Sequence, residues 1–123
     1  MRSVIYGTLI TLFLASAGIV QAGELDGKAL LCTSNYYTHH VYGLVFEKGK
    51  VTRVHVKGYS KSTIYKASYR LYGTKDVRWR NDSLNLKRET LKVSNDQCSI
   101  SSKTEIFQRL DEIIATAKKK NKL

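Results

Sequence analysis

Short segments of alternating polarity, separated by turn residues, fill the chain between residues 26 and 100. An apolar residue at every second position is typical of a strand that buries one face of a sheet. The expected strands cover residues 28–33, 42–47, 51–57, 63–72, 76–80 and 84–87, followed by a short strand at 91–94 and a last one around Cys98. Turns that recur about every 8–12 residues favour an antiparallel meander of about seven strands, either barrel-like or strongly curled.

The clearest hairpin joins residues 42–47 to residues 51–57 through a short turn at Gly49. Alternation predicts that Thr52, Val54 and Val56 face inward in the second strand. The expected buried residues are Tyr42, Leu44, Phe46, Val54, Val56, Tyr65, Tyr69, Leu71, Val77, Trp79, Leu84 and Leu86.

The periodicity changes after residue 100. Ser102 is followed three residues later by Glu105, which is the spacing of a helix capping box. Apolar residues then recur at helical spacing, at Ile106, Phe107, Leu110, Ile113, Ile114 and Ala117. Lysines at 118–120 complement the dipole at the end of the helix. The pattern predicts an amphipathic helix over residues 103–120 that packs on the sheet, so the fold class is mainly β (α+β).

Residues 1–22 are typical of a secretory signal peptide. Arg2 gives a positive start, and residues 4–20 are apolar or small and carry no charge. Small residues at the end of the segment favour cleavage before Gly23, with a cut before Gly18 as the alternative.

An uncleaved membrane anchor is the competing interpretation of this segment. Polar and glycine residues interrupt the apolar stretch, and its length is marginal for a bilayer span. We therefore expect a single exported domain, residues 23–123, that is periplasmic or secreted and has no stable transmembrane span after cleavage.

The two cysteines, Cys32 and Cys98, are expected to form a disulfide, because an exported protein folds in an oxidising compartment. The bond would close a loop of about 66 residues and stabilise the domain by on the order of 4 kcal/mol. A free thiol or a redox pair is the alternative, but the chain has no C-x-x-C motif.

The charge is strongly positive, with 21 Lys and Arg against 10 Asp and Glu and a net charge of +11. Residues 48–80 hold ten of the basic residues and a single acid, Asp76. Alternation predicts that one basic patch on the outer strand faces is formed by Arg53, Lys57, Lys66, Arg70, Arg78 and Arg80. Such a patch would bind an anionic lipid headgroup, a polysaccharide or a nucleic acid. The alternative is that the charge keeps the protein soluble and the strand edges unpaired.

Catalytic motifs are not found in the sequence, so we expect a non-enzymatic protein with no cofactor. His39 and His40 are adjacent but have no acidic residue nearby, and we expect no metal site. Two other functions stay open. One is a protein-binding module, such as an inhibitor or an envelope-complex subunit, that uses Tyr36, Tyr37 and Tyr59. The other is a barrel that holds a small apolar ligand.

Overall fold

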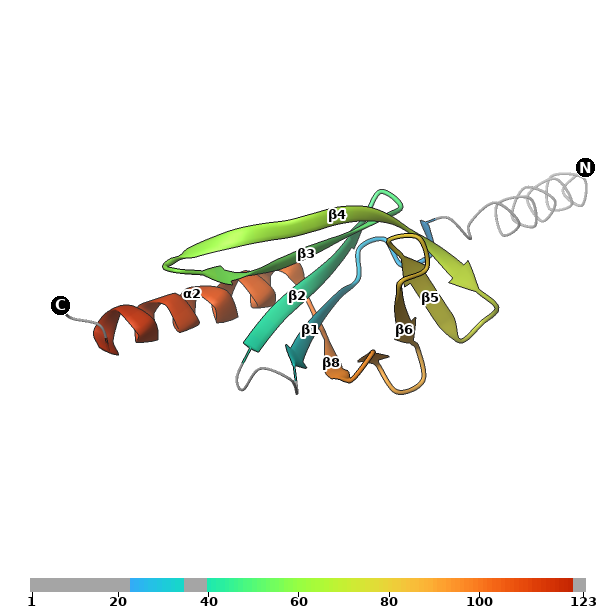
Figure 1. Ribbon diagram of the computed structural model, residues 1–123. Helices are drawn as coiled ribbons and strands as arrows, with labels where there is room; N and C mark the ends of the chain where they lie inside the picture. Colours follow the sequence, from blue (N-terminus) through green and yellow to red (C-terminus); the bar gives the residue numbers. More distant parts are fainter. Residues whose placement is uncertain (1–22, 35–39, 121–123) are drawn as a thin grey trace, which may run out of the picture.

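The expected meander closes on itself. In the computed structural model, which describes residues 23–34 and 40–120, eight strands form an antiparallel barrel and one helix packs on its outer face (Figure 1). The strands are β1 (Ala29–Ser34), β2 (His40–Glu47), β3 (Lys50–Lys57), β4 (Ser60–Tyr72), β5 (Asp76–Trp79), β6 (Leu84–Lys87), β7 (Lys92–Val93) and β8 (Asp96–Ser101), and the helix is α2 (Lys103–Lys120). The expected signal peptide, residues 1–22, lies outside the described residues.

Each strand pairs with the next, and β8 returns to pair with β1. In this last pairing Cys32 lies directly opposite Cys98, and the two form a disulfide. Both cysteines are buried. The expected disulfide is therefore confirmed, and it links the first strand to the last at the position where the barrel closes.

Aromatic side chains fill the barrel. The ring of Phe46 lies edge-on to Tyr69 and to Trp79, with ring centroids 5.3 Å and 6.3 Å apart. The expected core is confirmed, because all twelve residues are removed wholly or partly from solvent. Those fully buried are Tyr42, Leu44, Phe46, Val54, Tyr69, Val77, Trp79 and Leu86, and those half-buried are Val56, Tyr65, Leu71 and Leu84.

The predicted facing of β3 is wrong. Val51 belongs to the core inside the barrel, whereas Val54 and Val56 pack outside it, in the cluster under α2. Thr52 therefore faces outward, and Arg53 shares the inner face with Val51. Both faces of this strand are covered, one by the barrel and one by the helix, so apolar residues on it do not identify the inner face.

The helix covers the outer face of the first four strands. Ile106 and Leu110 are fully buried there, against Ala29, Val45 and Val54. At its start, the backbone N–H of Glu105 donates a hydrogen bond to Ser102 Oγ at 3.1 Å, as the capping box requires. The Glu105 carboxylate accepts from the Ser101 hydroxyl instead of returning to the backbone of Ser102.

Gly43 sets how closely the helix approaches the sheet. A Cβ atom on Gly43 would lie 2.4 Å from Cγ2 of Ile106, far inside contact distance. Because Ile106 is fully buried, it has little room to move away. The absence of a side chain at position 43 is therefore a condition for the packing of α2.

We expect Gly43→Ala to lower the free energy of unfolding by about 1–3 kcal/mol, because the added methyl group overpacks the helix interface. The fluorescence of Trp79, the single tryptophan, would follow unfolding in urea. Ser68→Ala, on the exposed outer face of β4, is the control and should change stability by less than about 0.5 kcal/mol. The double variant, Gly43→Ala with Ile106→Ala, should lose less stability than the sum of the losses in the two single variants. Strict additivity would contradict the proposed contact.

Replacing both cysteines by alanine, Cys32→Ala with Cys98→Ala, should remove on the order of 4 kcal/mol of stability, since the unfolded chain regains its loop entropy. Equilibrium unfolding in urea measures the loss. A reducing agent should destabilise the parent by a similar amount and leave the variant unchanged. A variant as stable as the oxidised parent would show that strand pairing alone keeps the barrel closed.

Candidate functional site

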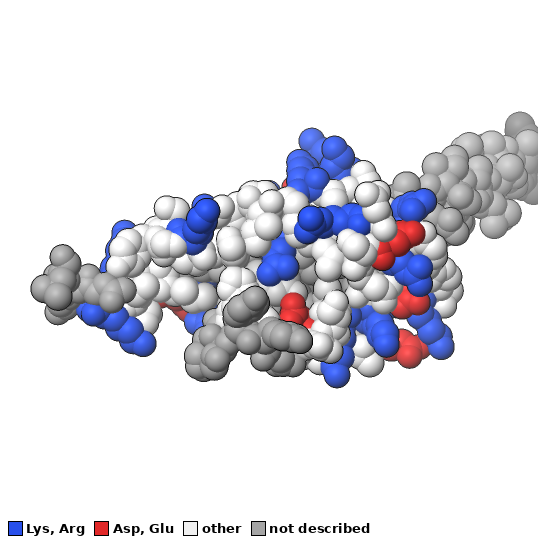
Figure 2. Space-filling view, viewed as in Figure 1, with Lys and Arg blue, Asp and Glu red and all other residues white. Residues whose placement is uncertain are grey.

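Basic side chains run across the outer face of the barrel where the helix does not cover it. We call this set the basic belt. It consists of Lys50 on β3, Lys66 and Arg70 on β4, Arg78 on β5, Lys87 on β6 and Lys92 on β7. All are exposed except Arg78, which is half-buried. In Figure 2, Lys and Arg spread over the visible face, while Asp and Glu gather mainly toward the end where β5 and β6 lie.

Like charges face each other within the basic belt. Arg70 lies directly opposite Arg78, and Lys87 lies directly opposite Lys92. Like-charged residues in directly opposed positions destabilise a pair of strands. The belt therefore sets like charges in opposed positions, although Asp76 lies opposite Lys87 on its other side and Asp82 forms an ion pair with Arg70.

A tyrosine holds the two arginines of the belt. The guanidinium Cζ atoms of Arg78 and Arg70 lie 4.2 Å and 5.8 Å from the centre of the Tyr72 ring. The Tyr72 hydroxyl donates to Asp82 at 2.7 Å, and Asp82 also forms an ion pair with Arg70 at 3.3 Å. The hydrogen bond from Tyr72 and the charge of Arg70 hold the pKa of Asp82 below its usual range. Arg78 Nε donates to Asn85 rather than to a carboxylate.

The six residues expected to form one patch are divided by the structure. Lys66, Arg70 and Arg78 lie together on the basic belt. The expected outward facing of Arg53 is wrong, because it shares the inner face with Val51. Lys57 is exposed at the end of β3, and Arg80 follows β5 and stacks on Tyr65. Lys50, Lys87 and Lys92 were missed, although they alternate with the buried residues Val51, Leu86 and Val93.

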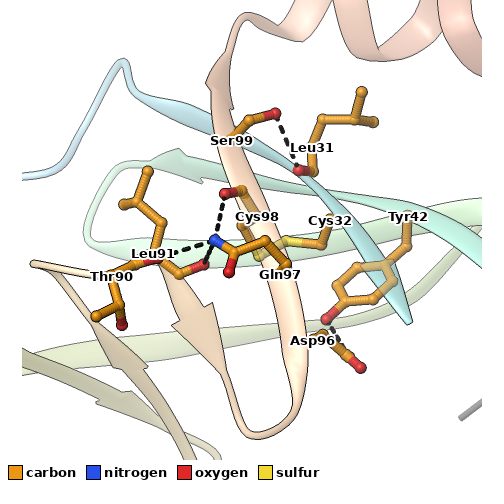
Figure 3. Close-up of a disulfide and its surroundings, with 9 residues drawn as sticks. All are labelled: Leu31, Cys32, Tyr42, Thr90, Leu91, Asp96, Gln97, Cys98 and Ser99. Atoms are coloured by element: carbon orange, nitrogen blue, oxygen red, sulfur yellow. Dashed lines mark hydrogen bonds between the residues drawn. A yellow bond between two sulfur atoms is a disulfide. The ribbon is translucent and has the colours of Figure 1, made fainter. Parts of the chain in front are cut away.

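A second cationic cluster lies at the end of the barrel where β2 begins. We call it the barrel mouth, and it contains His40, Tyr42, Arg53, His55, Tyr65, Arg80 and Asp96. The guanidinium Cζ of Arg53 lies 3.7 Å from the centre of the Tyr42 ring. The Tyr42 hydroxyl donates to Asp96 at 2.6 Å, close to the disulfide (Figure 3). The rings of His40 and His55 meet edge to face, 5.4 Å apart.

The barrel mouth holds polar atoms without partners. Within the described part of the chain, Arg53 Nε and His55 Nδ1 are the buried side-chain nitrogens that lack a hydrogen bond. Burial lowers the pKa of His55, and the nearby positive charges of His40, Arg53 and Lys57 lower it further. Burial and the hydrogen bond to Asp96 raise the pKa of Tyr42. The sequence gives no sign that His40 and His55 lie together, because only the register between β2 and β3 brings them into contact.

An apolar pocket opens at the opposite end of the barrel. It has a volume of about 360 Å³, and its lining includes Leu25, Leu30, Phe46, Leu86, Leu91 and Ile100. Ile100 is 80% exposed although it lies opposite the buried Leu30. Beside the pocket, the Tyr69 hydroxyl donates to Asp26 and accepts from the Leu25 N–H. Burial and the bond to Asp26 raise the pKa of Tyr69 to about 12.

Some of the other residues singled out in the sequence lie outside the part of the chain that the structure describes. His39, Tyr36 and Tyr37 lie outside the described residues, while Tyr59 is exposed in the hairpin between β3 and β4. Within residues 23–34 and 40–120, no three His, Cys, Asp or Glu side chains are grouped as a metal ion would require. No helix in those residues combines the length and apolar character needed to cross a membrane.

Comparison with protein-family models, curated proteins and solved structures finds no match.

We expect His40→Gln to raise the pKa of His55 toward its ordinary value of about 6.5, because a neighbouring positive charge is removed. Proton NMR titration of the ring signals measures this, with Lys118→Gln as a distant control. Because folding lowers this pKa, the unfolded chain binds more protons near pH 6, so His55 makes the parent less stable as the pH falls below about 6.5. An unchanged pKa in His40→Gln would contradict the coupling.

Proposed function

We propose that this protein is a non-enzymatic, exported binding protein whose basic belt holds a linear polyanion, with acidic polysaccharide as the favoured class. The observation that carries the proposal is the direct opposition of Arg70 to Arg78 and of Lys87 to Lys92. A surface that carries both acidic and basic residues would keep the protein soluble, and it would not need like charges in directly opposed positions. A bound polyanion would relieve the repulsion, so the arrangement favours a partner.

The shape of the belt favours a chain over a flat surface. The belt crosses five neighbouring strands of a closed barrel, so it curves around the molecule. A flexible polymer can follow that curve, whereas a membrane would contact only part of it. Nucleic acid binding would gain from a free aromatic ring, but the ring of Tyr72 on the belt has Arg78 over it. These two features favour a polysaccharide over lipid and nucleic acid.

A location outside the cytoplasm fits this function. The buried disulfide between Cys32 and Cys98 is compatible with folding under oxidising conditions. An acidic polysaccharide outside the cytoplasm would then be accessible to the belt. The segment at residues 1–22 supplies the expected export signal, and cleavage before Gly23 would leave the barrel intact.

A small apolar ligand is the second candidate, and the pocket lined by Leu30, Phe46 and Leu86 favours it. Pockets of this size and lining accept small apolar molecules. The two functions differ in their physical basis, because burial of an apolar ligand depends little on salt, whereas binding of a polyanion depends on it strongly.

Arg70→Gln combined with Arg78→Gln should weaken binding to a sulfated polysaccharide roughly five- to thirtyfold, because two ionic contacts of the belt are lost. Binding of the parent should fall steeply with salt, and the variant should show a shallower dependence. Isothermal titration calorimetry at two salt concentrations measures both effects. The melting temperature should change little, since loss of the exposed pair with Asp82 is offset by relief of the Arg70–Arg78 repulsion.

The matched control is Lys103→Gln with Arg109→Gln, which removes the same charge from α2 outside the belt. This control should bind the polysaccharide much as the parent does. Equal losses in both variants would show that net charge alone attracts the polymer. Tighter binding to anionic vesicles or to single-stranded RNA than to the polysaccharide would overturn the choice of partner.

A further inference from the structure

We propose that the barrel mouth binds a single tetrahedral oxyanion group, sulfate or phosphate, between Arg53 and Arg80 and beside His55. The arginines and histidines of the mouth are grouped on the inner side of the sheet, whereas the basic belt lies on its outer face. The inference therefore stands independently of the proposed function, and different variants test the two.

Arg53 lacks the partner that its position calls for. It is half-buried, and within the described residues it forms no ion pair and no hydrogen bond through its side chain. A partly buried charge without a counter-charge is unfavourable. The ring of Tyr42 under the guanidinium offsets part of this cost but accepts no hydrogen bond from its N–H groups. Nε is the buried Arg53 nitrogen without a partner, so the two terminal nitrogens are accessible to solvent and can also contact a ligand.

Arg80 places a second guanidinium over the ring of Tyr65. Its Cζ lies 4.9 Å from the centre of the Tyr65 ring, and Tyr65 is directly opposite Arg53 on the neighbouring strand. Trp79 Nε1 donates to the Tyr65 hydroxyl at 2.9 Å and so fixes the position of that ring. The two guanidinium groups, one over Tyr42 and one over Tyr65, present planar forks of N–H donors, which match the oxygens of a sulfate or phosphate.

The charge around His55 favours an anion over a cation. The groups that face it are His40 and Tyr42 from β2, Arg53 and Lys57 from β3 and Ser62 from β4. Tyr65, Arg80 and Asp96 complete the set of residues at the barrel mouth. Asp96 is the acid in this set, and the Tyr42 hydroxyl is bonded to it. A metal cation at this place would meet the positive charges of Arg53 and Lys57. An oxyanion would instead stabilise the protonated form of His55, so its binding should strengthen as the pH falls.

The first experiment titrates the parent protein with sodium sulfate at about pH 5.5 and about pH 7.5, at constant ionic strength with chloride. Sulfate keeps its charge over this range, so any pH effect comes from the protein. We expect saturable NMR shifts at Arg53 Nε and the His55 ring, with at least threefold tighter binding at the lower pH. Inorganic phosphate is titrated as the second ligand, and the anion that binds more tightly identifies the oxyanion that the site prefers. Shifts without saturation, or shifts confined to the outer face, would overturn the proposal.

The second experiment uses variants. Arg53→Gln and, separately, Arg80→Gln should each weaken sulfate binding at least tenfold. Arg80 is exposed in a turn, so its replacement keeps the test decisive if Arg53→Gln fails to fold. His55→Gln should still bind sulfate but lose most of the pH dependence.

The belt variant, Arg70→Gln with Arg78→Gln, is the matched control and should bind sulfate as the parent does. Sulfate binding that survives in both Arg53→Gln and Arg80→Gln, or that is lost in the belt variant, would overturn the assignment to the barrel mouth. Loss of polysaccharide binding in the belt variant with sulfate binding intact would separate the two sites. If the belt variant keeps both polysaccharide binding and sulfate binding, the belt does not have the proposed role, and the proposal for the barrel mouth still stands.

Discussion

The pairing of β1 with β8 is the interaction on which the rest of the structure depends, and the disulfide between Cys32 and Cys98 fixes it covalently. It converts a curled sheet into a barrel and so encloses the aromatic core. It also brings β8 close enough to β2 for Asp96 to accept the hydrogen bond of Tyr42. The barrel mouth is therefore assembled by the same closure, because the ring that supports Arg53 is held in place by an acid from the last strand.

Tyrosine and arginine are paired in the same way at three places. Tyr42 supports Arg53, while Tyr65 supports Arg80 and Tyr72 supports Arg78. Each tyrosine hydroxyl is held by a separate hydrogen bond, to Asp96, from Trp79 and to Asp82 respectively. The ring attracts the cation through its face and leaves the N–H donors available. This arrangement presents guanidinium groups in fixed positions on both sides of the sheet.

The sequence predicted the features whose signal is local. The strands, the helix over Lys103–Lys120 and the disulfide follow from alternation, helical spacing and cysteine count. The facing of β3 could not be predicted because a helix distant in sequence buries its outer side, which makes Val54 and Val51 equivalent in the pattern. The register shift in β3 between Arg53 and Val54 is equally invisible in composition. For the same reason, the grouping at the barrel mouth emerged only with the strand register. Lys87 and Lys92 alternate with the buried residues Leu86 and Val93, so the sequence did carry a signal for their outward facing.

The pairing of the first strand with the last also governs how the chain can acquire its structure. Contacts between residues far apart in sequence must form before the barrel is closed, and such folds assemble slowly because each long loop costs entropy. The helix follows β8, so the apolar outer faces of β1 to β3 stay uncovered until nearly the whole domain is present. A partly synthesised chain therefore exposes a surface that attracts other chains, and protection from aggregation is needed during that interval.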